Sequence, residues 1–213
     1  MKQGIIFDLD GVLLSTDEMH YEAWKSVADE LSIPFDRTVN NRLRGVSRME
    51  SLEIILEKST RDFSQEEKEE LATRKNDRYR TLLGSLTPDA VAPEVRETLS
   101  VLKARGLKLA VGSSSKNTKY ILQLTDLAHF FDAVSDGTNI TRSKPDPEVF
   151  LKAAEYIGLT PADCAVVEDA TAGIDAANAG GFTSIGIGDA AAYEKTEIRI
   201  LELSDLLQLV ELG

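Results

Sequence analysis

Short apolar runs alternate with helical patterns along most of this chain, and this alternation limits the fold more than any other feature. The runs lie at residues 5–7, 107–111, 164–167 and 182–187, with a weaker one at 133–135. Continuous apolar runs of this length are typical of strands buried on both faces. Helical patterns lie between them at 95–102, 120–127, 149–157 and 170–179, and 198–212 should add a last strand and helix. The alternation predicts an α/β fold, a Rossmann-like core with a parallel sheet.

One long stretch, residues 15–85, interrupts the alternation with four helical patterns and no convincing strand. Three of its helices are predicted to begin with a capping box, in which a Ser and a Glu three positions later satisfy free amides of the first turn. The pairs are Ser15 with Glu18, Ser47 with Glu50, and Ser64 with Glu67. We therefore predict an all-helical cap, residues 15–85, joined by two linkers to a core of residues 1–14 and 86–213. Such an attachment suits a lid.

Charge and cysteine content narrow the possible partners. The 213 residues carry a formal net charge of −12, which disfavours nucleic acid and anionic membranes because both bind through Lys and Arg. The single cysteine, Cys164, cannot form an internal disulfide and lies in an apolar run. Asp8 and Asp10 interrupt the first apolar stretch, so we expect no secretory signal. The expectation is a monomeric cytoplasmic protein that acts on a small molecule.

The strongest chemical signal is a pair of carboxylates, Asp8 and Asp10, directly after the first predicted strand and before Gly11. Ligands bind at the carboxyl ends of strands in an open parallel sheet. A spacing of two along an extended chain aims both side chains to one side. Two close carboxylates need a cation, and Mg²⁺ is a hard ion that prefers such oxygen ligands.

Three further groups follow other predicted strands or open helices. Ser113, Ser115, Lys116 and Asn117 form a polar segment that could bind an anion or simply cap a helix. Lys144 stands at a helix start, where a cation opposes the helix dipole, so a bound anion, neighbouring carboxylates or a solvated loop would explain it. Glu168 and Asp169 end the 164–167 run and are either further metal ligands or solvated acids at a helix start.

The order of these groups, an Asp pair, then Ser, Lys and an acidic pair, resembles that of the haloacid dehalogenase-like superfamily of phosphotransferases. The resemblance covers essentially the whole chain and is closest to the sugar phosphomutases of that superfamily. The segments that carry it are 20–24, 45–48, 74–77, 113–117 and 168–169. It implies Mg²⁺-dependent interconversion of β-glucose 1-phosphate and glucose 6-phosphate through an aspartyl phosphate and a bound glucose 1,6-bisphosphate.

The resemblance also implies roles for single residues. Asp8 would be the nucleophile and Asp10 the general acid and base. Mg²⁺ would be held by Asp8, the Asp10 backbone carbonyl and Asp169, with Glu168 nearby. Ser113 and Lys144 would neutralise the transferring phosphoryl group. Arg48, the last residue of the segment Gly45-Val46-Ser47-Arg48, would bind the second phosphate. Ser115, Lys116 and Asn117 would help to bind it.

The helical cap would close over the site and exclude water. His20 and Trp24, one helical turn apart, share a face that could line the cleft, although a surface His and a packed Trp are the alternatives. Lys75 and Asn76 could equally lie on a solvated helix face. Ser15 stands where the family often has Asp, which affects only the hinge.

Two other functions stay open from the sequence. In a sugar-phosphate phosphatase with the same core, water would attack the aspartyl phosphate instead of a sugar hydroxyl, and the fold does not separate the two activities. A catalytically silent metal-binding module is disfavoured by the complete set of Asp8, Asp10, Ser113, Lys144 and Asp169.

Overall fold

A six-stranded parallel sheet forms the centre of the molecule, and the computed structural model describes residues 2–209. Its strands follow the order β3-β2-β1-β4-β5-β6, and each neighbouring pair is parallel. The strands are β1 (Gly4–Phe7), β2 (Lys108–Gly112), β3 (Ala133–Ser135), β4 (Cys164–Glu168), β5 (Thr183–Gly186) and β6 (Ile198–Arg199). The predicted parallel sheet is confirmed, including its weak strand at 133–135.

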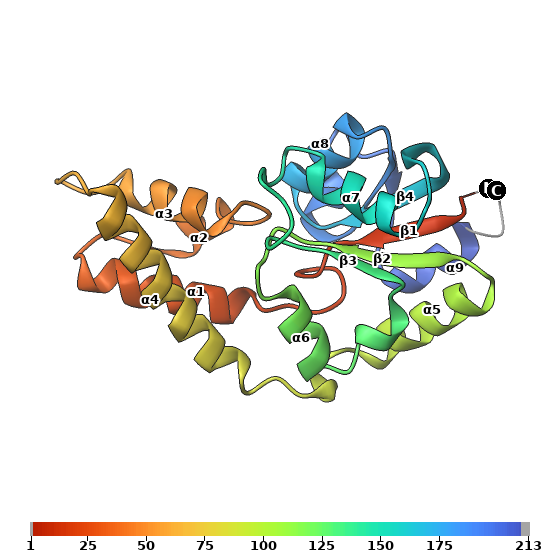
Figure 1. The fold of residues 1–213 in the computed structure, drawn as a ribbon, viewed down its shortest axis with the longest axis horizontal. Coiled ribbons are helices and arrows are strands. Elements are labelled where there is room, and N and C mark those ends of the chain that lie inside the picture. Colours follow the sequence, from red (N-terminus) through yellow and green to blue (C-terminus); the bar gives the residue numbers. More distant parts are fainter. Residues whose placement is uncertain (1, 210–213) are drawn as a thin grey trace.

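Helices cover both faces of this sheet (Figure 1). One layer consists of α5 (Pro93–Ala104), α6 (Thr118–Leu124) and α9 (Leu206–Leu209), and the other of α7 (Glu148–Tyr156) and α8 (Thr171–Ala179). Ile5 and Phe7 pack into the first layer and Ile6 into the second, as the twofold alternation of a strand requires. The stretch predicted to end the chain supplies β6 and α9, and its residues 210–212 lie outside the described part.

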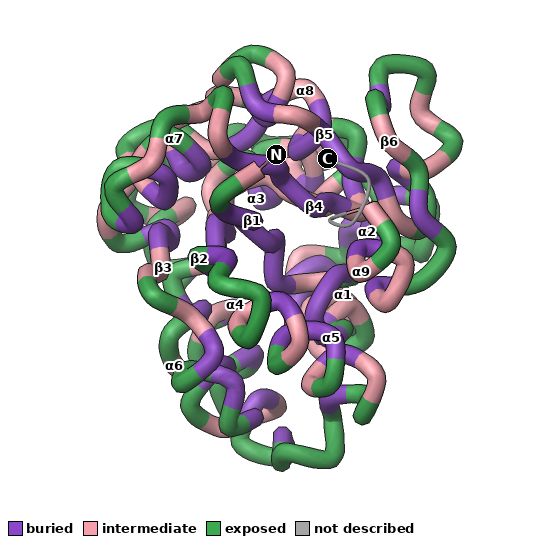
Figure 2. The backbone as a smooth tube through the Cα atoms, turned by 90° about the vertical axis from the view of Figure 1, so that its right-hand side faces the viewer, coloured by how far each residue is buried: buried purple, intermediate pink, exposed green. Residues whose placement is uncertain are grey.

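A second group of helices stands to one side of the sheet in Figure 1, coloured red to yellow. It consists of α1 (Asp17–Glu30), α2 (Arg37–Asn41), α3 (Arg48–Leu56) and α4 (Gln65–Leu83), which follow β1 and precede α5. We call α1–α4 the helical insert. Trp24, Leu52 and Leu71 are buried in an apolar cluster of its own, and Figure 2 shows buried segments in both the insert and the core.

Two of the three predicted capping boxes are confirmed. Ser47 and Glu50 cap α3, and Ser64 and Glu67 cap α4, each with both reciprocal hydrogen bonds. The box predicted for Ser15 and Glu18 is wrong, because α1 begins at Asp17 after Thr16. The amide and the hydroxyl of Thr16 both donate to the carboxylate of Asp10, and this tie to the strand end determines where the helix starts.

The cysteine prediction is confirmed: Cys164 is a buried free thiol, and burial raises its pKa to about 11. No helix within residues 2–209 combines the length and the apolar character needed to cross a bilayer.

Candidate active site

A cavity of about 720 Å³ lies between the carboxyl ends of the strands and the helical insert. Its wall brings together most of the residues that the sequence selected. From the core these are Asp8, Asp10, Ser113, Ser115, Lys116, Asn117 and Asp169, and from the insert they are His20, Trp24, Gly45, Arg48 and Lys75. The two remaining predicted residues, Lys144 and Glu168, are fully buried and contact each other.

Two carboxylates, those of Asp8 and Glu168, account for the buried ammonium group of Lys144. Its Nζ lies 2.5 Å from Asp8 Oδ1 and 2.5 Å from Glu168 Oε1, with no exposed surface. Burial alone would lower the pKa of Lys144, but Asp8 and Glu168 reverse the effect and hold it above its ordinary value. Of the explanations that the sequence left open for Lys144, the solvated loop is wrong and the neighbouring carboxylates are confirmed. The ammonium also fixes the orientation of Asp8.

Asp8, Glu168 and Asp169 form an acidic cluster that could bind a divalent metal ion. One carboxylate oxygen from each lies within 4.8 Å of the other two. Burial, with Glu168 and Asp8 adding to it, raises the pKa of Asp169 to about 8, and burial raises that of Glu168 to about 7 in spite of Lys144. Three carboxylates against one ammonium leave excess negative charge, and a hard divalent cation would balance it.

The missing side chain of Gly11 leaves space for the Asp169 carboxylate in this cluster. Its φ is +79°, a left-handed conformation that favours glycine, and a Cβ there would lie 2.0 Å from Asp169 Oδ2. Any side chain at this position would therefore displace the Asp169 carboxylate. The donor set and the space around it both suit a metal ion with oxygen ligands.

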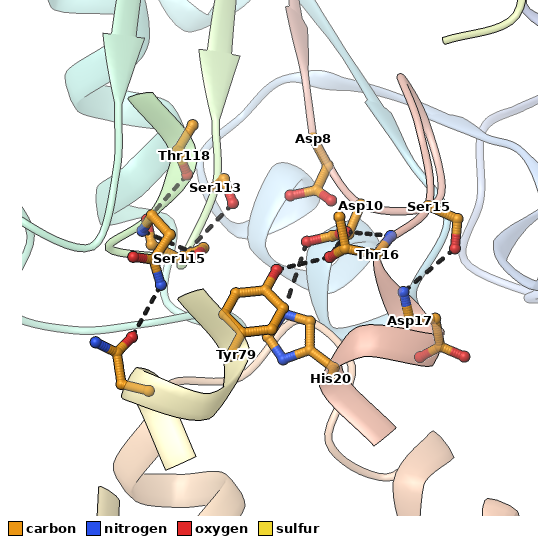
Figure 3. Close-up of polar contacts among 12 residues, drawn as sticks. Asp8, Asp10, Ser15, Thr16, Asp17, His20, Tyr79, Ser113, Ser115 and Thr118 are labelled. Atoms are coloured by element: carbon orange, nitrogen blue, oxygen red, sulfur yellow. Dashed lines mark hydrogen bonds and ion pairs between the residues drawn. The ribbon is translucent and has the colours of Figure 1, made fainter. Parts of the chain in front are cut away.

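Asp10 lies outside this cluster, and Figure 3 shows its contacts with Thr16 and His20. Its Oδ1 accepts hydrogen bonds from the Thr16 amide (2.9 Å) and the Thr16 hydroxyl (2.5 Å). The same hydroxyl lies 2.7 Å from the Tyr79 hydroxyl, and His20 Nε2 lies 4.0 Å from Asp10 Oδ2. Burial raises the pKa of Asp10 to about 6, the Thr16 bonds oppose this shift, and the charge of Asp8 adds to it. Asp10 is therefore held in place with its second oxygen free of the Thr16 contacts.

Two insert cations at the cavity wall, Lys75 and Arg48, have only neutral hydrogen-bond partners. Lys75 is 3% exposed, its Nζ lies 2.8 Å from His20 Nδ1, and the Trp24 ring lies 4.9 Å away. Arg48 donates to Asn76 Oδ1 at 2.7 Å. Burial and the charge of Arg48 lower the pKa of Lys75, and burial lowers that of Arg48. The alternatives of a solvated Lys75 and a surface His20 are wrong, whereas Trp24 both packs in the insert and reaches the cavity wall.

The serine segment after β2 faces the cavity and does not cap the helix that follows it. Ser113 Oγ accepts from the Ser115 amide at 3.3 Å, and Ser115 Oγ accepts from the Asn117 amide at 3.2 Å, so both serines order the loop, whereas α6 begins after Asn117 without a side-chain cap. Both serines also face the cavity. Asn117 Nδ2 donates to Asn76 Oδ1 at 3.0 Å, so the amide that holds Arg48 also touches the core. Lys116 is exposed at the rim.

Two residues of this network escaped the sequence analysis. Thr16 precedes His20 by four positions and Tyr79 follows Lys75 by four, so each shares a helix face with a residue that was selected. That spacing is the signal that could have found them. Neither Thr nor Tyr suggests proton or phosphate chemistry by its type alone.

Comparison with known proteins agrees with this geometry. The haloacid dehalogenase-like hydrolase family matches residues 2–181. A β-phosphoglucomutase from Bacillus subtilis is 41% identical over 96% of this chain and 91% of its own length. A phosphorylated carbohydrates phosphatase from Thermotoga maritima is 31% identical over 86% of this chain and 83% of its own.

A solved structure also resembles this fold over nearly its whole length. The crystal structure of β-phosphoglucomutase from Clostridium difficile superposes with a TM-score of 0.93 at 35% identity, covering 99% of this chain and 96% of that one. Sequence motifs, fold and cavity thus point to one group of enzymes. The chain belongs to the haloacid dehalogenase-like hydrolase family.

Proposed function

We propose that this chain is an Mg²⁺-dependent β-phosphoglucomutase that interconverts β-D-glucose 1-phosphate and D-glucose 6-phosphate. The observation that carries the proposal is that one cavity has groups suited to phosphate chemistry at both ends. Asp8 and Ser113 lie at the sheet end, and Arg48 lies on the insert with only a neutral amide as its hydrogen-bond partner. A half-buried cation whose hydrogen-bond partner is neutral favours a bound anion. A sugar bisphosphate would satisfy both ends.

The transferring phosphoryl group would react at Asp8. Its carboxylate oxygen attacks phosphorus and forms an aspartyl phosphate, while the bond from phosphorus to the sugar oxygen breaks. Lys144, held against Asp8, and the hydroxyl of Ser113 offset the negative charge of the phosphoryl oxygens. Asp8, Asp169 and the backbone carbonyl of Asp10 would hold Mg²⁺, with Glu168 beside them, and the ion would supply further charge neutralisation.

Asp10 would move the proton. As a general acid it protonates the departing sugar oxygen, and as a general base it later takes the proton from the sugar hydroxyl that attacks the aspartyl phosphate. The two hydrogen bonds from Thr16 support this role because they fix one carboxylate oxygen and leave the other toward the cavity. In this scheme a trace of glucose 1,6-bisphosphate first phosphorylates Asp8. The 6-hydroxyl of β-glucose 1-phosphate then attacks the aspartyl phosphate and gives glucose 1,6-bisphosphate, which reorients, donates its 1-phosphate to Asp8 and leaves as glucose 6-phosphate.

The distal phosphate would be held by Arg48, with Ser115, Lys116 and Asn117 on the core side. His20, Trp24, Gly45 and Lys75 would line the space for the sugar between the two phosphates. In this proposal residues 15–85 are a cap that closes on residues 1–14 and 86–213. Closure excludes water from the aspartyl phosphate and orients the sugar hydroxyl as acceptor.

The cytoplasm is the proposed compartment, where the buried thiol of Cys164 would stay reduced. The proposed enzyme is a monomer, and its only partner is a small sugar phosphate. The cations at the cavity wall favour such a ligand, while the overall charge of −12 disfavours a polyanion such as nucleic acid.

A sugar-phosphate phosphatase is the second candidate, and the Thermotoga maritima relative favours it. The chemistry at Asp8 is the same until water replaces the sugar hydroxyl as acceptor. The ratio of products distinguishes the two activities.

The test supplies β-glucose 1-phosphate, Mg²⁺ and a trace of glucose 1,6-bisphosphate, and measures glucose 6-phosphate and inorganic phosphate. We expect chiefly glucose 6-phosphate from the wild type. Arg48→Ala should shift the ratio toward inorganic phosphate by about tenfold or more, because orientation of the acceptor is lost. Arg42→Ala is the matched control, since Arg42 is an exposed insert arginine paired with Glu57. Wild type that releases mainly inorganic phosphate would make the phosphatase the correct function.

A further inference from the structure

One carboxylate of the insert contacts both the helix that carries Arg48 and the loop that carries Lys144. Glu50 is the third residue of α3, and its Oε2 accepts a hydrogen bond from the Ser47 amide at 2.8 Å. The same oxygen accepts a hydrogen bond from the hydroxyl of Ser143, 93 positions later in the chain. Glu50 thus belongs to a capping box and to a contact between insert and core.

On the insert side, this contact is tied to the position of Arg48. The capping box fixes the backbone at the start of α3, and Arg48 is the first residue of that helix. Glu50 therefore stabilises the helical turn to which the Arg48 side chain is attached.

On the core side, Ser143 immediately precedes Lys144, whose Nζ contacts Asp8. The loop before it is anchored separately by Glu148, whose Oε2 accepts from the Thr141 amide (3.0 Å) and the Arg142 amide (2.8 Å). The Ser143 hydroxyl is thus a firmly placed partner at the end of an anchored loop.

The Glu50 contact is charge-assisted. Partial burial would raise the pKa of Glu50, but the hydrogen bonds from Ser143 and Ser47 outweigh it and hold that pKa below its ordinary value. The group is therefore an anion at neutral pH, and hydrogen bonds to anions are stronger than neutral ones. Another insert-to-core contact, from Ser114 Oγ to the Gly45 carbonyl at 3.1 Å, joins neutral groups.

We propose that Glu50 is a positioning residue that sets the distance between the two phosphate sites by docking the start of α3 on Ser143. The inference rests on the proposed function, because it assigns the two sites to the two phosphates of one substrate. Glu50 touches no reacting atom in this scheme. It acts through Arg48 on one side and through the loop of Lys144 on the other.

The sharpest variant is Ser143→Ala, which removes the contact and leaves the capping box of α3 intact. We expect its kcat/KM for β-glucose 1-phosphate to fall roughly tenfold, the effect of losing one hydrogen bond to a charged group. Ser143→Thr keeps a hydroxyl and should restore most of the rate. Glu50→Gln should lie between wild type and Glu50→Ala, since its amide oxygen still accepts hydrogen bonds.

The matched control is Glu67→Ala. Glu67 has the same place in the capping box of α4 but bonds to the exposed Arg61 instead of the core. Glu50→Ala and Glu67→Ala should lower the melting temperature to a similar extent, while only Glu50→Ala should slow turnover. In the double variant of Glu50→Ala and Ser143→Ala, the loss should be no greater than in Glu50→Ala alone.

A second readout separates positioning from general damage. Acetyl phosphate transfers its phosphoryl group to the Asp8 carboxylate and releases acetate, and it has no second phosphate to reach Arg48. The rate of Asp8 labelling by acetyl phosphate should therefore stay within about twofold of wild type in Ser143→Ala, judged against the roughly tenfold loss in kcat/KM expected for β-glucose 1-phosphate.

The outcomes are distinguishable from failure of the proposed function. If wild type releases inorganic phosphate instead of glucose 6-phosphate, the mutase is wrong, and the same variants are compared on phosphate release from glucose 6-phosphate. If Ser143→Ala equals wild type on the sugar phosphate, or loses acetyl phosphate labelling to the same degree, the positioning role of Glu50 is wrong.

Discussion

At the residue scale, Asp10 is set apart from the acidic cluster although it lies two positions from Asp8. The cluster consists of Asp8, Glu168 and Asp169, whereas the Asp10 carboxylate is engaged by Thr16. We predict that Asp10→Asn keeps Mg²⁺ affinity within about threefold, while turnover falls about 100-fold or more, the usual range for a general acid and base.

Calorimetric titration with Mg²⁺ and the steady-state rate check this prediction together. Asp169→Asn serves as the opposite case, because it removes a proposed ligand and should weaken Mg²⁺ binding strongly. A comparable loss of Mg²⁺ affinity in Asp10→Asn would place its side chain among the metal ligands.

Residue types predicted much of this site, and tertiary contacts determined the rest. Asp8, Asp169 and Ser113 could be selected because carboxylates and hydroxyls at strand ends indicate phosphate and metal chemistry. For Lys144, the sequence left open whether its partner is a bound anion or nearby carboxylates. The partner is decided by tertiary structure, because Glu168 at the end of β4 contacts the Lys144 ammonium. Tyr79 shares a helix face with Lys75, but its contact with Thr16 could not be predicted, because the two residues lie 63 positions apart.

At the element scale, one carboxylate of α7 holds the loop that precedes this helix. Lys152, then the amides of Arg142 and Thr141, lower the pKa of Glu148 to about 2 from its ordinary 4.5. Because the folded-state pKa is the lower one, Glu148 stabilises the fold fully above pH 4.5, and this effect is lost as the pH falls toward 2. Glu148→Gln should therefore unfold at lower denaturant concentration than wild type at pH 7, and the difference should shrink toward pH 3.

Urea midpoints at several pH values test this, with Glu155→Gln on the exposed face of the same helix as control. A difference that stayed constant from pH 7 to pH 3 would show that the charge of Glu148 is not the cause.

Helices and strands were predicted well where periodicity and caps agree. The predicted strand at 182–187 is observed at Thr183–Gly186, and both α3 and α4 begin at their predicted capping boxes. The start of α1 was mispredicted, because Ser15 and Glu18 have the right spacing but Thr16 is bonded to Asp10. A capping pattern in the local sequence cannot show that Thr16 binds Asp10, which lies outside the helix at the end of β1.

At the scale of the whole molecule, an ion pair joins the insert to the core at a second place. Arg44 contacts Asp189 of the core at 3.0 Å, and the Asp189 side chain is 83% exposed. Exposed pairs contribute roughly 0–1 kcal/mol and are screened by salt. We predict that Asp189→Asn lowers kcat/KM less than about fivefold at low salt, and that the difference disappears near 1 M NaCl.

Steady-state rates at both salt concentrations are the measurement. A tenfold loss that persists at high salt would mean that this pair, rather than the Glu50 contact, dominates closure. The division of the chain into insert and core followed from the interrupted alternation, whereas these contacts between the two could not be predicted, because no local pattern encodes them.

The insertion of α1–α4 after β1 also bears on the order in which the chain assembles. Ile6 of β1 pairs with Ala110 of β2, 104 positions later, so these two strands meet only after a long loop closes. The hydroxyls of Thr16 and Tyr79 meet at 2.7 Å, and that contact alone spans 63 of those positions. An insert that folds first on its local contacts therefore shortens the loop and lowers the entropic cost of pairing β1 with β2 by roughly 0.8 kcal/mol. Mutations that weaken the apolar cluster of Trp24 and Leu52 would then slow formation of a sheet that neither residue touches.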